Sequence, residues 1–138
     1  MRSRRALPAQ DSGAAAVEFA LVLPLLLLLV FGLIDFGRAY SMQISLTQAA
    51  REGVRVAALG GTAGEATLRT TNAAAPVTAV TVGVTTCPAT VLPTSDAQVI
   101  ASRTYNYITP IQPLFTFMGQ PGLAAPVITG RGRMRCNG

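Results

Sequence analysis

The chain opens with a long apolar run. No residue from Phe19 to Ile34 is charged, and residues 14–17 extend the run toward the N-terminus. Together these positions make about 21 residues, or roughly 31 Å of α-helix. Because the hydrocarbon core of a bilayer is about 30 Å thick, the pattern predicts a transmembrane helix over residues 14–34.

A helical period continues beyond the apolar run. Modestly apolar residues recur at steps near 3.6, which predicts that the same helix extends over residues 35–59 outside the membrane. The recurring positions are Phe36, Tyr40, Thr47, Ala50, Val54 and Ala57. Two charged pairs, Asp35–Arg38 and Glu52–Arg55, are spaced for exposed faces of this helix. Gly60 and Gly61 then predict its end.

The rest of the chain, residues 60–138, reads as a small exported domain. A short helix is predicted over 64–75, and alternating apolar residues predict strands around 80–84, 99–108 and 126–136. The fold class is therefore α+β, with one long N-terminal helix packed on a small antiparallel sheet. Residues 109–126 are predicted to be a loop whose apolar groups form a partner surface or cover the sheet.

The basic charge of the chain is uneven. All 11 cationic side chains are arginines, and Arg2, Arg4 and Arg5 precede the apolar run. Basic residues flank the cytoplasmic side of a membrane helix. We therefore expect a single pass through a bacterial cytoplasmic membrane, with residues 1–13 in the cytoplasm and residues 35–138 on the outer side. A competing interpretation takes the run as a secretory signal that is cleaved after Ala39 and releases a soluble protein.

The composition argues against an enzyme. Without His or Lys, the chain has no Ser–His, Cys–His or Ser–Lys pair to activate a nucleophile. Two cysteines without a histidine do not make a structural zinc site, and no cofactor is expected. Arg131, Arg133 and Arg135 alternate on one face of the last predicted strand. They form either a solvated, charged sheet edge or an interaction surface for phosphates or an acidic partner, and nucleic acid is not expected.

Two residues interrupt the apolar run. Pro24 lacks a backbone N–H, so a kink or local melting of the helix is expected there, which membrane helices tolerate. Glu18 places a carboxylate near the membrane edge, where a charge is costly and is usually retained for a partner or a role. Alternatively, the Glu18 side chain has no such role and simply reaches the lipid headgroups.

Four segments carry a family resemblance. The sequences SGAAAVEF (12–19), AVEFALVLPLLL (16–27), FGLIDFGR (31–38) and QAAREGVRVA (48–57) resemble the TadE-like family, the pseudopilins or minor pilins of tight-adherence (Flp-type) pilus systems. The resemblance implies a pilin-like fold, cleavage by a prepilin peptidase between Gly13 and Ala14, and assembly with other pilin subunits through the hydrophobic helix. The alternative is a permanently anchored exported module that recruits partners and never enters a fibre.

The expected cleavage gives Glu18 a partner. It would leave Ala14 with a cationic amine, four residues before Glu18 and on the same helical face. In a bundle of anchors, Glu18 of one subunit could neutralise the amine of its neighbour, and Phe19 and Pro24 would belong to the same assembly segment. This hypothesis makes Glu18 the residue that sets the register between subunits.

Cys87 and Cys136 are the only cysteines, and both fall in the exported part. In an oxidising compartment they should form a disulfide. Closing a loop of about 50 residues stabilises a domain by about 4 kcal/mol in the chain-entropy model. Two free thiols are the alternative if the compartment is less oxidising.

Overall fold

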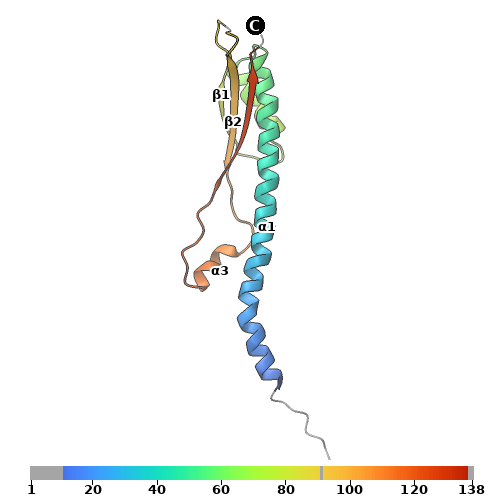
Figure 1. The fold of residues 1–138 in the computed structure, drawn as a ribbon, viewed down its shortest axis with the longest axis vertical. Helices are drawn as coiled ribbons and strands as arrows, with labels where there is room; N and C mark the ends of the chain where they lie inside the picture. The colour runs from blue at the N-terminus through green and yellow to red at the C-terminus, as the bar shows by residue number, and fades with distance from the viewer. Residues whose placement is uncertain (1–10, 91, 137–138) are drawn as a thin grey trace, which may run out of the picture. The chain divides into compact units, whose positions relative to one another are not determined.

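A computed structural model describes residues 11–90 and 92–136. Its dominant element is the helix α1, Asp11–Ala58, which confirms the long helix expected from the sequence (Figure 1). The leader arginines Arg2, Arg4 and Arg5 lie outside the described residues. By its contacts the chain divides into two compact units, one with α1 up to Asp35 and residues 109–123, the other with residues 36–108 and 124–136.

The end of α1 is a glycine cap, as the sequence indicated. Gly60 has a φ of 88°, a left-handed conformation in which a side chain would be strained. The Gly61 N–H then reaches back to the Val56 carbonyl over 3.0 Å and satisfies one of the last free carbonyls of the helix. The chain therefore turns away from the helix axis at Gly60.

The short helix expected over 64–75 is α2, Ala63–Ala73. It begins with a capping box, a feature that the sequence reading missed. The Thr62 N–H donates to Glu65 Oε2 over 2.8 Å, and the Glu65 N–H donates to Thr62 Oγ1 over 3.2 Å. The bonds from the Thr62 backbone and then its hydroxyl lower the pKa of Glu65, because they stabilise the ionised carboxylate.

Three antiparallel strands form one sheet in the order β1-β2-β3, which confirms the α+β prediction. They are β1 (Thr81–Thr85), β2 (Asp96–Thr104) and β3 (Val127–Arg135). The second strand starts and ends earlier than expected, so Tyr105 and Tyr107 lie outside it. The Tyr105 N–H still donates to the carbonyl of Pro126, but the ladder ends there because proline has no N–H to donate in return.

The stretch predicted to be a loop, 109–126, contains a helix. This helix, α3, spans Ile111–Phe117 and lies in the first unit beside the N-terminal half of α1 (Figure 1). Pro110 at its N-cap and Pro113 in its first turn misled the prediction. Both are compatible with a helix start, where proline costs no intrahelical hydrogen bond. The segment therefore groups with the anchor half of α1.

The core of the second unit is built from small residues. It contains Leu46, Ala49, Ala50, Val54, Ala57 and Ala58 of α1, Ala66 and Ala74, Ala97, Val99 and Ala101 of β2, and Cys136. The predicted apolar stripe on α1 was right at Ala50, Val54 and Ala57 but wrong at its start. Phe36 is 71% exposed and Tyr40 is also exposed, because the small residues, not the large aromatic ones, face the sheet.

Two glycines of β3 explain why small residues face the sheet. A Cβ on Gly130 would overlap the Leu46 carbonyl group, and a Cβ on Gly132 would lie 2.5 Å from the Ala50 carbonyl oxygen. The strand backbone thus lies directly on the helix backbone. Such an approach is possible only where both elements lack bulk, so the glycines of β3 select the alanine face of α1.

Candidate assembly surface

The N-terminal half of α1 is an uncovered apolar surface. In the part of the chain that the structure describes, one helix is long and apolar enough to cross a membrane, and its most apolar window is not buried by the protein. Leu21, Leu25 and Leu29 are all exposed. A surface of this length and apolarity fits the hydrocarbon core of a bilayer, which agrees with the expected transmembrane segment.

The expected processing site lies within the first turns of this helix. Gly13, Ala14 and Glu18 are exposed, and so is Phe19, which is the first large apolar residue after the acid. Over the described ranges, Glu18 makes no ion pair. Its carboxylate is therefore available to a group from outside the chain, while Ala14 lies one helical turn earlier on the same face.

Pro24 lies inside α1 without ending it, so the local melting expected there is absent. The proline still removes one backbone donor, which leaves the Ala20 carbonyl without its intrahelical partner. Pro24 is half-buried in this structure. Its role in assembly stays a prediction.

Asp35 marks the end of the apolar run and differs from its expected role. The sequence placed it in an exposed pair with Arg38, yet Asp35 is buried. Its carboxylate accepts a short hydrogen bond from the Thr109 hydroxyl, which comes from the segment that leads into α3. Sequence spacing could not reveal this contact, because its partner is 74 residues away along the chain.

Glu52 also differs from its expected pairing. It was placed with Arg55 on one face of α1, but its Oε2 lies 2.9 Å from Nη2 of Arg69 on α2. Both side chains are about half exposed, so the pair contributes little to stability. It joins the exposed edges of α1 and α2.

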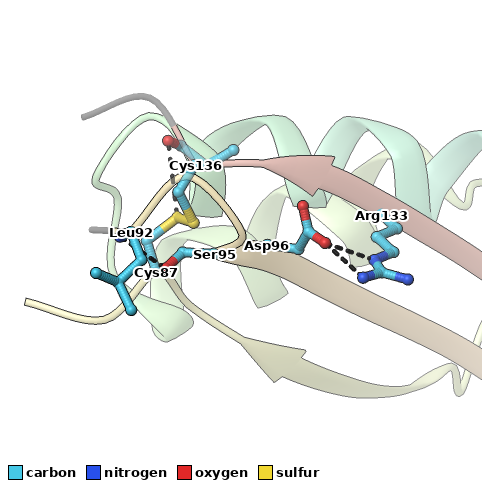
Figure 2. Close-up of a disulfide and its surroundings, with 7 residues drawn as sticks. Cys87, Leu92, Ser95, Asp96, Arg133 and Cys136 are labelled. Carbon is cyan, nitrogen blue, oxygen red and sulfur yellow. Dashed lines mark hydrogen bonds and ion pairs between the residues drawn. A yellow bond between two sulfur atoms is a disulfide. The ribbon is translucent and has the colours of Figure 1, made fainter. Parts of the chain in front are cut away.

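The end of the sheet nearest the C-terminus is closed by a disulfide between Cys87 and Cys136 (Figure 2). Their Cα atoms are 5.8 Å apart, a usual separation for a disulfide. The Cys136 N–H also donates to the Ser95 carbonyl over 3.0 Å. The last strand is thus tied both to the segment after β1 and to the start of β2.

The three arginines of β3 are all exposed, on the side of the sheet opposite to Gly130 and Gly132. Arg133 is held by Asp96 of β2, with its Nε 2.9 Å and its Nη2 2.5 Å from the same carboxylate oxygen (Figure 2). Arg131 and Arg135 flank this ion pair. The exposure of these arginines is compatible with both predictions for this face, a charged sheet edge and an interaction surface.

The match between this chain and a known family lies in the helix α1. The model of the family described as TadE-like protein matches residues 13–55. No curated protein and no solved structure matches the chain. The match begins at Gly13, includes Glu18 and Pro24, and ends within α1, so the resemblance seen in the sequence is confirmed there and the family pattern belongs to the helix, not to the sheet.

Proposed function

We propose that this chain, whose residues 13–55 match the TadE-like family model, is a minor pilin or pseudopilin of a tight-adherence pilus system. The role proposed is structural, that of a pilin-like component of such a system. The observation that carries the finer proposal is the N-terminal half of α1, whose apolar side chains are uncovered and whose Glu18 makes no ion pair in the described chain.

The proposed topology places the N-terminus in the cytoplasm. The arginines at positions 2, 4 and 5 precede the apolar run, and such residues stay on the cytoplasmic side of a membrane helix. Residues 14–34 then cross the cytoplasmic membrane, and residues 35–59 together with the domain 60–138 are exported. The disulfide between Cys87 and Cys136 supports this orientation, because disulfides persist in oxidising compartments.

Processing by a prepilin peptidase is the first step of the proposed role. Cleavage after Gly13 removes the basic leader and leaves a cationic amine on Ala14. That amine lies about 6 Å from Glu18 along the helix axis, since four residues make slightly more than one turn. Both charges then occupy one face at the membrane edge, where neither is well solvated.

Assembly follows from the cost of these two charges. In a bundle of pilin helices, the Ala14 amine of one subunit and Glu18 of its neighbour neutralise each other when the helices are shifted into register. A bundle shifted out of register leaves both charges unpaired in a medium of low dielectric constant, which costs several kcal/mol. Glu18 therefore selects one register, and the surrounding leucines supply the packing.

The experiment compares Glu18→Gln with the wild-type chain in a cell that contains the pilus system. We expect Glu18→Gln to remain in the membrane but to co-isolate with the other pilin subunits at least about tenfold less, because the neighbouring amine loses its counter-charge. Glu52→Gln is the matched control, since that carboxylate lies on the exported half of α1 in an exposed pair with Arg69.

A second variant tests whether the amine is the partner. Gly13→Leu should block processing, so no amine forms, and Glu18→Gln should then have no further effect in that background. Normal co-isolation of Glu18→Gln would overturn the register hypothesis. Failure of the wild-type chain itself to co-isolate with pilin subunits would instead favour the alternative, an anchored exported module that stays outside the fibre.

A further inference from the structure

The segment that contains α3 is unusual because it is apolar, uncharged and uncovered. No residue from Thr104 to Gly130 carries a charge, although arginines flank both ends of this stretch. Phe117 is 82% exposed and Met118 is also exposed. A soluble protein seldom leaves large apolar side chains together in a stretch without charged residues, so this surface is suited to an apolar environment.

Several polar groups of this segment are bonded within it. The Thr116 hydroxyl donates to the Gln112 carbonyl over 3.1 Å, and the Gln112 side-chain amide donates to the Leu123 carbonyl. Most groups at the C-terminal end of α3 are also paired, because the N–H groups of Met118, Gly119 and Gln120 bond back to the carbonyls of residues 114, 116 and 115. In water such polar groups can bond to the solvent, whereas in lipid they need partners within the protein.

The segment is fixed to the end of the transmembrane run. The Thr109 hydroxyl donates to the buried carboxylate of Asp35, directly after the last apolar residue, Ile34. Residues 109–123 also belong to the same compact unit as the anchor half of α1. The start of the α3 segment therefore lies at the membrane boundary of the anchor.

We propose that α3 and its flanking residues, 110–123, rest in the outer leaflet of the bilayer, with Phe117 and Met118 among the lipid acyl chains. The subunit then holds the membrane by two elements, the span of α1 and this shallow segment. The inference rests on the proposed anchoring of α1. It identifies the occupant of the apolar surface as lipid, because the uncharged, internally bonded segment continues the lipid-facing surface of the anchor.

The test uses tryptophan fluorescence, since the chain contains no tryptophan. The full-length F117W variant is reconstituted in phosphatidylcholine vesicles whose acyl chains carry bromine, a quencher, close to the glycerol end. Two controls are made in the same way. L29W reports the anchor, because Leu29 is an exposed residue of the apolar run, and L68W reports an exposed position on α2.

We expect brominated lipid to remove most of the emission of F117W and L29W and to leave that of L68W unchanged. Emission of F117W that resists brominated lipid while L29W is quenched would overturn the inference and leave the anchor intact. This holds whether water or a second protein surrounds Phe117. If L29W also resists quenching, the anchor itself is wrong and the proposed function falls with it. M118W repeats the test at a second position if F117W does not fold.

Discussion

The two halves of α1 differ in the size of their apolar side chains and in what covers them. In the N-terminal half, leucines such as Leu21 and Leu25 are exposed in this structure. In the C-terminal half, Ala49, Ala50 and Ala57 are completely buried, while the large residues Phe36 and Tyr40 are exposed. Within one continuous helix, large apolar side chains are therefore exposed in the N-terminal half and small ones are buried in the C-terminal half.

The difference teaches which partner each half serves. A lipid bilayer accepts bulky, flexible leucines, since its acyl chains form a fluid apolar surface. The sheet offers a fixed backbone, and Gly130 and Gly132 bring it so close that only small residues fit between the two elements. Large apolar side chains are exposed in the half that resembles a membrane span, and buried alanines mark the half that carries the sheet.

Removing the disulfide should weaken the sheet-bearing half most. We expect the paired substitution of Cys87 and Cys136 by serine to lower the free energy of unfolding of residues 36–136 by about 4 kcal/mol, because the unfolded chain gains loop entropy. Urea unfolding of the detergent-solubilised chain, followed by tyrosine circular dichroism, measures the loss. Membrane retention through residues 14–34 should not change.

The oxidation state can be checked on the wild-type chain alone. Identical mobility on reducing and non-reducing gels, with both thiols open to alkylation before reduction, would contradict the bridge. Because Cys136 is buried, the alkylation is carried out on the denatured, unreduced chain, where only a disulfide protects the two thiols.

A methyl group on β3 should also break the close packing of the sheet on α1. We expect Gly130→Ala to lower the free energy of unfolding of residues 36–136 by about 2 kcal/mol or more, since the new Cβ overlaps the Leu46 carbonyl and forces the backbones apart. Gly83→Ala on β1 is the control, because its Cβ would meet no atom within 4 Å. Equal effects of the two substitutions would show that close approach is not what selects the alanine face.

The cap of α2 predicts a smaller effect that depends on pH. The folded state lowers the pKa of Glu65 below its ordinary value of about 4.5, so the contribution of the cap is complete above that pH and is lost as the pH falls through the folded value. We expect the wild-type chain to lose stability relative to Glu65→Gln as the pH drops below about 4.5. A pH-independent difference between the two would argue against the cap. Thr62→Ala should cost about 1 kcal/mol at neutral pH.

The sequence predicted the helices and strands wherever a local pattern determines them. The apolar run, the glycine stop at Gly60 and the alternating valines of β1 each depend on near neighbours, and each prediction was confirmed. The sequence predictions failed where a distant segment of the chain determines the environment of a residue. The buried face of α1 is selected by Gly130 and Gly132, and the environment of Asp35 is set by Thr109. Neither contact can be predicted from the residues that are its neighbours in the sequence.

The candidate site divides in the same way. Gly13, Ala14, Glu18 and the apolar run are adjacent in the sequence, so a pattern reveals them together. The α3 segment was predicted as a loop because its prolines were counted as breakers, although a helix start tolerates them. Its connection to the anchor through Asp35 is visible only in three dimensions.

The central claim is that the first half of α1 is processed and then assembled, and the N-terminal residue of the mature protein tests it most directly. Mass spectrometry should be applied to the chain purified from membranes that contain a prepilin peptidase. Gly13→Leu and Gly32→Leu serve as a matched pair, because a side chain meets open space at both positions. We predict that the wild-type chain and Gly32→Leu begin at Ala14 and that Gly13→Leu keeps its leader. A wild-type chain that keeps its leader, or one that begins at Tyr40 or Ser41, would contradict the account.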